Sequence, residues 1–523
     1  MRVLTAEAMR RADERAIHQL GMPSLVLMEN AAIGVVDAIG DRFPDAETVA
    51  LFCGPGNNGG DGLAVARHLL VRGYRPTVWL VHGGKRLSPD AAHQLELCRG
   101  LDIEVTEVAS EADLHGALAV ASGAELVVDA LFGIGLGRGL EGVFAAAVDG
   151  INGLGRPVLA VDLPSGLDGS SHRPPGPHVR ADLTVTFAAL KVAHLLPPAA
   201  LACGEVAVAD LGVPASYLEE TGTGLHLLTA GELAGLLPPR AASAHKGSFG
   251  HVLLVAGSTG KSGAAVLAAR AAVRAGAGLV TAAVPAPVLS LVASGSIESM
   301  SLPLDADQEG RICLAAVDRV LAACERATAL AVGPGLGTDG ETSEAVRRLA
   351  RQAVLPLVLD ADGLNAFAGR PEELRHRPAA TVLTPHPGEL GRLLGTTSAA
   401  VNDDRMAAVT EAARVTGAVV ALKGHQTLVA APDGAVAINP TGNAGMASGG
   451  SGDVLTGVVA ALLGQGLAAW EATCVAVFVH GLAGDLVAGG RGAEAIAAGD
   501  LAAALPDAFA TLRQGSVGRS SSQ

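Results

Sequence analysis

The sequence predicts a two-domain α/β protein in which each domain is a doubly wound sheet covered by helices. At 523 residues the chain is too long for one ordinary hydrophobic core. Short apolar runs that end in glycine or aspartate alternate with segments of helical spacing, as expected for buried parallel strands joined by helices. Only 2% of the residues are aromatic, whereas 68 are glycine. The cores must therefore be built from Ala, Val and Leu around close backbone contacts.

The first half opens with an amphipathic helix that stops near Gly21. Five strands are predicted after it, at TVALFCGPG, PTVWLVHGG, ELVVDALFG, RPVLAVDLPSG and ADLTVTFAAL, with helices such as DGLAVARHLLVRG between them. The pattern lapses near residues 212–228, where turn-forming residues are frequent. We expect a first domain at 1–215 and a linker at 216–227.

The second half of the chain shows the same alternation of strands and helices, but its sequence is not a repeat of the first half. Its predicted strands are GHVLLVAGS, AGLVTAAVP, ATALAVGPG, LPLVLDADG, AATVLTPHPG and AVVALKGHQTLVA. They indicate a second α/β domain at 228–515. The polar residues 516–523 are expected to form a disordered tail.

Composition and charge argue against membrane, secreted and nucleic-acid-binding proteins. No apolar run reaches the roughly 18 to 20 uncharged residues that span a bilayer, and the charged N-terminal segment lacks the features of a signal peptide. We expect a cytoplasmic protein that does not bind membranes. The net charge of -15, without a Lys/Arg run, argues against nucleic-acid binding. The six cysteines form no CxxC pair, so buried free thiols are expected rather than disulfides or a zinc site.

Three loops of the first domain carry residues suited to ligand binding. The run Cys53–Gly62 follows a strand and opens a helix, so its backbone amides can approach an anion, although a tight structural turn is the alternative. Asp129 and Asp162 each end a strand, and Ser165 follows closely. Ligands of doubly wound sheets bind at the carboxyl ends of the strands, so these side chains could share a pocket. Each acid alone could equally cap a helix or stabilise a turn.

Together these motifs, with ADLTVTFAALK, resemble the N-terminal epimerase domain of the NAD(P)H-hydrate repair family over about residues 1–215. The resemblance implies a Rossmann-like three-layer αβα fold. Asp162 matches the acid that contacts the substrate, and we expect it to carry the catalytic proton. Asn58, Asp129 and Ser165 match potassium ligands, and their oxygens suit a hard cation. By this resemblance the hydrated nucleotide contacts Asn57, Asn58, Gly59, Gly60, Asp61, Gly133, Ile134, Gly135, Leu136, Gly137, Arg138, Gly139 and Asp162.

Two glycine-rich loops stand out in the second domain. GSTGKSG at Gly257–Gly263 looks like a P-loop, but Val255 stands where that motif requires glycine, so a strand-to-helix loop is expected. The run Asn439–Gly457 contains SGGSGD at a predicted helix start, where the amides of Gly450–Gly452 could cradle phosphate and Asp453 could lie beside it. An ordinary acid at a helix start is the alternative for Asp453.

With TPHPGE, DADGLN and LKGHQT, this loop resembles the ribokinase-like superfamily over about residues 228–510, and within it the ADP- or ATP-dependent NAD(P)H-hydrate dehydratases. A ribokinase-like αβα fold, magnesium and Asp453 as the catalytic base follow from that resemblance. The hydrated nicotinamide nucleotide is expected beside Ala265, Gly335, Gly337, His386 and Asp453. The adenine nucleotide is expected at Lys423, Gly424, His425, Gln426, Thr427 and Gly452.

The function expected from both halves is the repair of hydrated NADH and NADPH. One domain would interconvert the R and S epimers, and the other would dehydrate the S epimer with ADP or ATP. A ribokinase-like small-molecule kinase and a non-catalytic scaffold are the alternatives. We also expect a homo-oligomer. The choice between ADP and ATP, and between the NADH and NADPH hydrates, is left open by the sequence.

Overall fold

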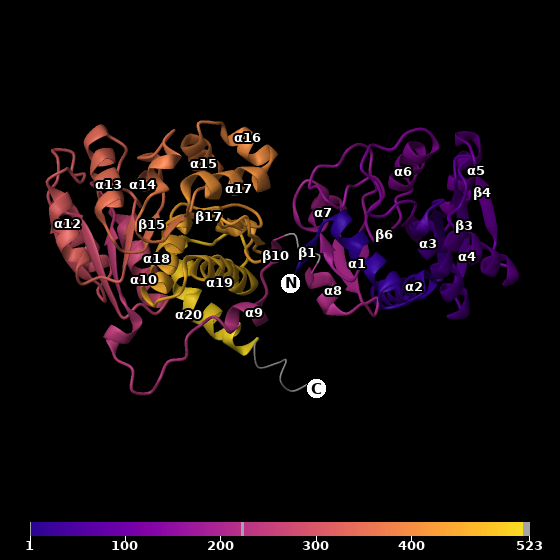
Figure 1. Cartoon of the computed structure of the whole chain (residues 1–523), viewed down its shortest axis with the longest axis horizontal. Helices are drawn as coiled ribbons and strands as arrows, with labels where there is room; N and C mark the ends of the chain where they lie inside the picture. Colours follow the sequence, from indigo (N-terminus) through magenta and orange to yellow (C-terminus); the bar gives the residue numbers. More distant parts are fainter. Residues whose placement is uncertain (1, 221–223, 516–523) are drawn as a thin grey trace. The chain divides into compact units, whose positions relative to one another are not determined.

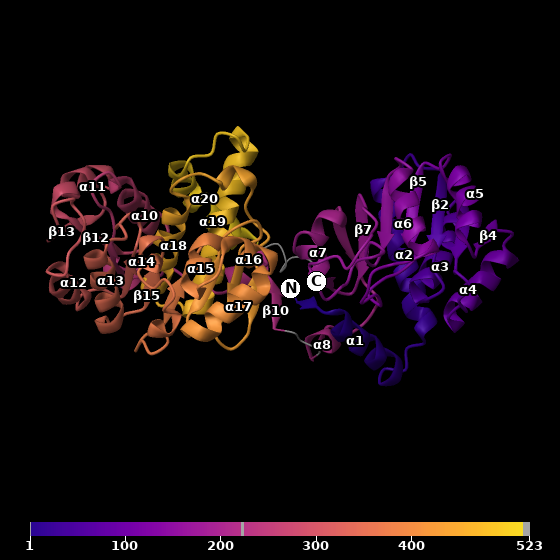
Figure 2. The ribbon, with the colours of Figure 1, turned by 90° about the horizontal axis from the view of Figure 1, so that it is seen from above.

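The computed structural model describes residues 2–220 and 224–515, and the predicted disordered tail at 516–523 lies outside them. The chain divides into two compact units, Arg2–Leu225 and a second unit that begins at His226 (Figures 1 and 2). Part of the predicted linker is regular structure, because helix α8 (Ala215–Glu220) and strand β10 (Leu225–Leu227) lie within it. Both elements are too short to give a periodic signal in the sequence.

The first domain contains a parallel sheet of seven strands in the order β4-β3-β2-β5-β6-β7-β9. Side chains of β2 alternate between the two faces, so Leu51 packs in one core cluster and Phe52 in the other. The strands are β2 (Thr48–Cys53), β3 (Arg75–Val81), β4 (Val105–Val108), β5 (Leu126–Ala130), β6 (Val158–Val161), β7 (Leu183–Phe187) and β9 (Glu205–Ala209), with a small β1 (Val3–Leu4) and β8 (Leu190–Lys191) pair beside them.

Helices cover both faces of this sheet, which confirms the predicted three-layer class. The first four helices belong to the Leu51 cluster, and α5 and α6 to the Phe52 cluster. The helices are α1 (Ala6–His18), α2 (Ser24–Arg42), α3 (Asn57–Val71), α4 (Pro89–Gly100), α5 (Glu111–Ala121), α6 (Val143–Gly153) and α7 (Val192–Leu195), followed by α8.

The second domain has a sheet of ten strands in the order β10-β19-β18-β17-β16-β15-β14-β11-β12-β13. The pairs from β17 to β13 are parallel, whereas β17, β18 and β19 form an antiparallel meander. The predicted run AVVALKGHQTLVA is therefore a hairpin and not one strand. The strands after β10 are β11 (His251–Val255), β12 (Leu279–Pro285), β13 (Met300–Leu304), β14 (Ala329–Val332), β15 (Leu357–Leu359), β16 (Thr381–Leu383), β17 (Val419–Leu422), β18 (Leu428–Ala430) and β19 (Val436–Ile438).

One core cluster of the second domain joins one face of the sheet to four long helices. These are α10 (Ser262–Arg274), α18 (Ser451–Gly464), α19 (Ala469–Arg491) and α20 (Ala498–Gln514). The other helices are α9 (Ala230–Ala234), α11 (Leu289–Gly295), α12 (Ala316–Cys324), α13 (Gly340–Gln352), α14 (Asp362–Asn365), α15 (Pro387–Leu394), α16 (Ser398–Asp403) and α17 (Arg405–Thr416).

Helix α19 alone among the described residues is long and apolar enough to cross a membrane by length and composition. However, 72% of its apolar window is buried inside the protein. Its side chains form part of the core cluster with α18 and α20. The apolar character of α19 is therefore accounted for by packing within the domain.

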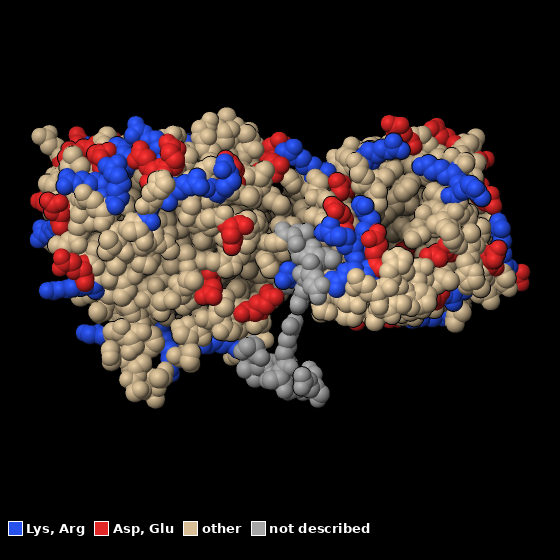
Figure 3. Space-filling model, viewed as in Figure 1, with Lys and Arg blue, Asp and Glu red and all other residues tan. Residues whose placement is uncertain are grey.

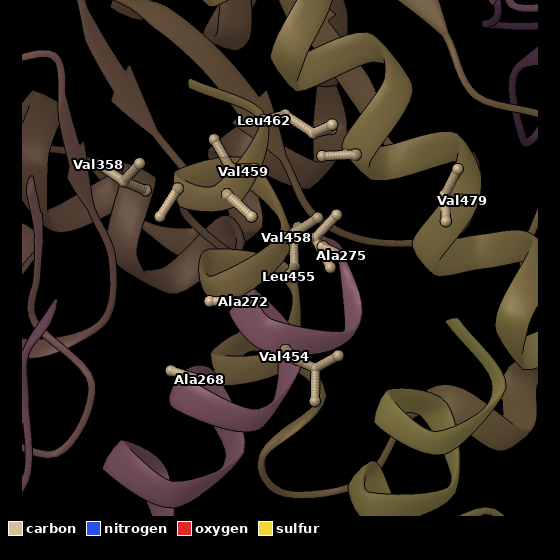
Figure 4. Close-up of a cluster of buried hydrophobic side chains, with 14 of the residues drawn as sticks. Ala268, Ala272, Ala275, Val358, Val454, Leu455, Val458, Val459, Leu462 and Val479 are labelled. Carbon is tan, nitrogen blue, oxygen red and sulfur yellow. The ribbon is translucent and has the colours of Figure 1, made fainter. Parts of the chain in front are cut away.

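On the visible face of both domains, acidic and basic side chains are interspersed (Figure 3). All six cysteines are free, and five of them are buried, as the sequence predicted. Glycine and alanine allow the close packing that the low aromatic content requires. At the contact between α10 and α18, Ala268 and Ala272 lie beside Val454 and Val458 (Figure 4).

This contact depends on Gly457. A Cβ there would lie 2.2 Å from the Ala268 carbonyl oxygen and 2.8 Å from the Ala271 Cβ. Since both helices belong to the core, neither can move without opening it. The α10–α18 contact fixes where α18 begins, and therefore the position of the SGGSGD loop.

We predict that Gly457→Ala lowers the free energy of unfolding of the second domain by roughly 1–3 kcal/mol, because the added methyl group overpacks the contact. Gly489→Ala is the matched control, since Gly489 is an exposed position of α19 where a Cβ meets no atom within 4 Å. It should raise stability by about 0.5–1 kcal/mol. Denaturant unfolding measures both, and equal effects of the two substitutions would contradict the packing argument.

Candidate active sites

The glycine-asparagine loop of the first domain is held tightly against the end of the sheet. It runs from the end of β2 into the first turn of α3, so the residues 57–61 form the start of that helix. A Cβ on Gly59 would lie 1.8 Å from the Gly54 carbonyl oxygen, and one on Gly54 would lie 1.9 Å from that of Leu131. Only glycine allows this backbone approach, which brings the ends of β2 and β5 together.

Asp129 and Ser165 are in direct contact and fully buried. The Ser165 Oγ donates to Asp129 Oδ1 at 2.6 Å, and the Ser165 backbone N–H donates to Oδ2 at 2.8 Å. Burial nevertheless raises the pKa of Asp129 to about 6. This carboxylate therefore lies in a place that favours a compensating positive charge.

Asn58 reaches the same region from α3. A Cβ on Gly133 would lie 2.9 Å from Asn58 Oδ1 and 2.7 Å from Asp162 Oδ2, so these two oxygens converge beside Gly133. The Asn58 Nδ2 is buried without a hydrogen-bond partner. An orphaned buried amide group of this kind indicates a site that is completed by a polar ligand.

Asp162 is the best-organised acid of the first domain. It has a positive φ of 64° just after β6, and its carboxylate accepts from Lys191 Nζ at 2.8 Å, Thr186 Oγ1 at 3.1 Å and the Ile134 backbone N–H at 3.2 Å. Burial by itself would raise the pKa of Asp162, but the charge and hydrogen bond of Lys191 lower it below the usual range. Asp162 is therefore an ionised group held in a buried pocket.

Lys191 is the partner of Asp162, and the sequence analysis gave it no role. The residue is fully buried, and Nζ also donates to Thr186 Oγ1 at 2.6 Å. A buried lysine is rare unless it is paired. The signal in the sequence was the charge that ends the apolar run ADLTVTFAALK, but only the fold shows that it reaches Asp162.

Two further acids near Asp162 favour the protonated form. Burial, with the charges of Asp162 and Asp13, raises the pKa of Asp61 well above its usual range. Burial also raises the pKa of Asp13, on α1, to about 6. The Asp13 Oδ1 is buried without a hydrogen-bond partner. The pocket therefore places two acids with raised pKa values near one whose pKa is lowered, which is a typical arrangement for proton transfer.

The predicted loop 133–139 divides into two parts. Gly133 and Ile134 lie at Asp162, as described above. The residues after them turn toward solvent, with Gly135, Gly137 and Arg138 exposed and Leu136 and Gly139 partly buried.

In the second domain, the predicted nucleotide-binding residues line one cavity of about 630 Å³. They come from the β17–β18 turn and from the start of α18. His386 was expected beside the hydrated nicotinamide, but it also lines this cavity. Most of the other lining residues lie in the run Asn439–Gly457 or the motif TPHPGE: Pro387, Asn439, Thr441, Gly442, Asn443, Ala444, Met446, Ala447, Ser451 and Leu455. The sequence analysis did not single out the remaining three, Val477, His480 and Gly481.

A second, more open cavity of about 440 Å³ contains Gly335 and Asp453. Ala265 does not line it, because its side chain is fully buried. Its neighbour Ala264 lines the cavity instead, together with Gly260, Lys261, Gly263, Leu267, Asp362, Gly449 and Gly450. Gly337 is not among the lining residues, and its N–H donates to Asp362 Oδ2 at 2.8 Å.

Gly452 and Asp453 are adjacent in the first turn of α18 but line different cavities. Gly452 lines the cavity of the predicted nucleotide-binding residues, and Asp453 lines the open one. The N-terminus of α18 carries free backbone N–H groups and the positive end of the helix dipole. Two ligands bound in these cavities would meet at this turn.

The charges around this turn centre on Lys423. Its Nζ donates to Asp360 Oδ1 at 2.7 Å and lies 3.6 Å from Glu389 Oε2. The other Asp360 oxygen, Oδ2, accepts from Thr456 Oγ1 at 2.6 Å, which ties the cluster to α18. Burial raises the pKa of Asp453 to about 7, and the negative charge of Asp360 is the second cause of this rise. Asp453 therefore titrates near neutral pH.

The β17–β18 turn is supported by Arg405, which the sequence analysis missed. The guanidinium group donates to the carbonyl oxygens of Leu422, His425 and Gln426. Gln426 has a positive φ of 52°, a conformation that needs such support. No local sequence pattern links Arg405 to a turn that lies 20 residues further on.

The P-loop-like run is a strand-to-helix loop between β11 and α10. Its Gly257 N–H donates to the Pro334 carbonyl oxygen and its Ser258 Oγ to the Gly335 carbonyl oxygen, each at 2.7 Å. The loop therefore forms one wall of the open cavity together with Gly335.

Comparisons with known proteins agree with this division. Residues 24–193 match the family model described as YjeF-related protein N-terminus, and residues 252–507 match the model described as NAD(P)H-hydrate dehydratase. A bifunctional NAD(P)H-hydrate repair enzyme from Moorella thermoacetica is 43% identical over 517 residues, which are 98% of each chain. The Escherichia coli enzyme of the same name is 34% identical over 95% of this chain and 92% of its own length.

Among solved structures, the ADP/ATP-dependent NAD(P)H-hydrate dehydratase from Bacillus subtilis, co-crystallized with ATP/Mg2+, shares 31% identity. It covers 56% of this chain and 100% of its own, with a TM-score of 0.49. The full-length relatives confirm the family expected from the motifs. Because both domains match and the identity extends over nearly the whole length, this chain belongs to the family of bifunctional NAD(P)H-hydrate repair enzymes.

Proposed function

We propose that this enzyme restores hydrated NADH and NADPH in two steps. The first domain interconverts the R and S epimers of the hydrate, and the second dehydrates the S epimer with ADP or ATP as phosphoryl donor. The observation that carries this proposal is the position of Gly452 and Asp453, which face two neighbouring cavities from one helical turn. Such an arrangement suits transfer of a phosphoryl group between two bound ligands.

In the second domain, Asp453 takes the proton from the ring hydroxyl of the hydrate. The oxygen attacks the terminal phosphorus of the nucleotide, and the bond from that phosphorus to its bridging oxygen breaks. The amides at the start of α18 stabilise the negative charge. The ring nitrogen then expels phosphate, and loss of the neighbouring proton restores the dihydronicotinamide. Phosphorylation thus converts a poor leaving group into a good one.

Magnesium belongs to this step as the partner of the nucleotide phosphates. When bound, it would supply positive charge to them, and the carboxylate of Glu389 is a hard oxygen donor of the kind that it prefers. Within the described residues no group of three His, Cys, Asp or Glu side chains forms a metal cage. We therefore assign the ion mainly to the phosphates.

In the first domain, epimerisation requires loss and return of water at the carbon beside the ring nitrogen. Burial and the nearby charges of Asp162 and Asp13 raise the pKa of Asp61, so that it is suited to donate a proton to the departing hydroxyl group. Asp162, held ionised by Lys191, can accept a proton from the returning water. The substrate also contacts the loop 57–61 and the residues Gly133–Gly139 in this proposal.

Potassium fits the oxygens of Asn58, Asp129 and Ser165. They are donors of the hard type, and the raised pKa of Asp129 indicates a carboxylate that lacks a counter-charge. The ion would supply that charge. We further propose a cytoplasmic homo-oligomer that binds neither membranes nor nucleic acid.

A small-molecule kinase is the second candidate, because the two cavities of the second domain would equally suit transfer to another hydroxyl compound. The kinase would release a phosphorylated product. The fusion to an epimerase domain favours repair, since both activities then act on one substrate.

The deciding experiment incubates the purified enzyme with both NADPH-hydrate epimers, magnesium, potassium, and ADP or ATP. We expect full recovery of dihydronicotinamide absorbance from both epimers. With potassium replaced by a larger organic cation, conversion of the R epimer should slow while that of the S epimer continues. A stable phosphorylated product would support the kinase, and no reaction of the hydrate would exclude repair.

Asp453 should give the dehydratase a characteristic pH dependence. The base acts when ionised, so the rate should fall as the pH decreases through about 7, the raised pKa of Asp453. Asp453→Asn should lower kcat by about 10²–10⁴-fold. The rate of NADPH recovery from the pure S epimer measures both effects. An Asp453→Asn enzyme with the wild-type rate would contradict the assignment, and the unfolding transition of its second domain serves as the folding control.

Lys191→Met should abolish epimerisation and destabilise the first domain. The substitution leaves Asp162 buried without its cation, which costs roughly 3–5 kcal/mol of unfolding free energy. The pKa of Asp162 should rise, because burial then acts unopposed. Chromatography of the epimers and denaturant unfolding measure the two effects. Lys85→Met is the control, since Lys85 is the other lysine of the first domain and is exposed. Similar behaviour of the two variants would contradict the role of Lys191.

A further inference from the structure

His480 connects helix α19 to the catalytic turn of α18. Its side chain lines the nucleotide cavity beside Ser451 and Gly452. The His480 Nε2 lies 3.0 Å from the Ser451 carbonyl oxygen and 3.4 Å from the Ser451 Oγ. Ser451 is the first residue of α18. The contact therefore holds the N-terminus of the helix, where the first backbone N–H groups have no partner within the helix.

The hydrogen bond fixes the protonation of the ring. A carbonyl oxygen can only accept, so Nε2 carries the proton and donates it. Burial, together with the nearby charge of Lys423, lowers the pKa of His480 to about 4. The ring is therefore neutral under ordinary conditions, with Nδ1 left as an acceptor.

This contact also restrains the Gly452 amide. The carbonyl of Ser451 and the N–H of Gly452 belong to one planar trans peptide and point in opposite directions. In α18 the Ser451 carbonyl points along the helix and the Gly452 N–H points out of its N-terminus, and the His480 contact holds the peptide group in that orientation. Gly452 has no side chain to obstruct that position, and a Cβ there would lie 3.0 Å from Lys423 Nζ.

Helix α19 fixes the facing part of the cavity as well. The Asn439 Nδ2 donates to the Val477 carbonyl oxygen at 3.1 Å, and the Thr441 Oγ1 donates to that of Phe478 at 2.8 Å. Asp485 accepts from the Gly442 N–H at 2.8 Å. The 439–443 loop and the start of α18 are thus anchored on the same helix, which sets the width of the cavity.

We propose that His480 is a positioning residue for the dehydration step, which aims the Gly452 amide at the phosphoryl group of the adenine nucleotide. The inference rests on the proposed function of the second domain. His480 acts through the peptide group and takes no part in proton transfer.

The test compares His480→Phe, which keeps a ring but removes the donor, with His480→Gln, which restores a side-chain N–H. With the pure S epimer of NADPH hydrate, His480→Phe should lower kcat by about 10–100-fold while the KM for the hydrate changes little. His480→Gln should recover most of the rate. Thr473→Val is the control, since Thr473 is buried on α19 and donates only to Ala469 within that helix.

A His480→Phe enzyme with the wild-type kcat, or a His480→Gln enzyme as slow as His480→Phe, would overturn the inference. If His480→Phe lacks the unfolding transition of the second domain, His480→Ala takes its place in the same comparison. A wild-type enzyme that does not dehydrate the hydrate would instead refute the proposed function. In that case calorimetric titration with ADP still tests the inference, since His480→Phe should weaken ADP binding by about tenfold and His480→Gln should not.

Discussion

Both sites depend on the same electrostatic constraint, in which one lysine, buried in the first domain and partly buried in the second, lies among several carboxylates at the end of a parallel sheet. Lys191 pairs with Asp162 in the first domain, and Lys423 pairs with Asp360 in the second. Burial first, and the charges of neighbouring carboxylates second, raise the pKa of Asp61 in one site and of Asp453 in the other. Each domain thus holds a carboxylate paired with lysine and, near it, an acid whose pKa is raised.

The close packing of small residues places these charges. Gly457 lets α18 approach α10, and Thr456 beside it donates to Asp360. The position of the catalytic turn therefore follows from the core beneath it. In the first domain, Gly54 and Gly59 have the same effect, because their backbone contacts bring α3 to the end of β5. Both sites therefore depend on glycines that allow helices and loops to approach each other closely.

The two activities proposed for the chain make a single repair pathway. Hydration of a nicotinamide ring gives two epimers, and a dehydratase that recognises one of them leaves the other unused. An epimerase in the same polypeptide supplies the missing form. Each domain has its own sheet and its own proposed catalytic acids, so the activity of the unchanged domain is an internal reference when the other site is substituted.

The sequence by itself determined the family, the α/β class, most buried strands and the loops that carry the chemistry. These features are local, since a buried strand is an apolar run and an anion-binding loop is a run of glycines. Strands β4, β9 and β13 were missed because they carry exposed or partly exposed residues and lack a continuous apolar run. The second strand of the β17–β18 hairpin was merged with the first for want of a strong turn signal.

Only the tertiary structure decided which side chains meet. Lys191, Arg405 and His480 contact groups 17 or more residues away, so no local pattern could assign their partners. The fold also showed that Ala265 is buried and that His386 lines the same cavity as Lys423 and Gly452. The position of a residue along a strand or loop predicts the end of the sheet at which it lies. The pairing of charges, and the position of α18 between two cavities, depend instead on packing between segments that are distant in the sequence.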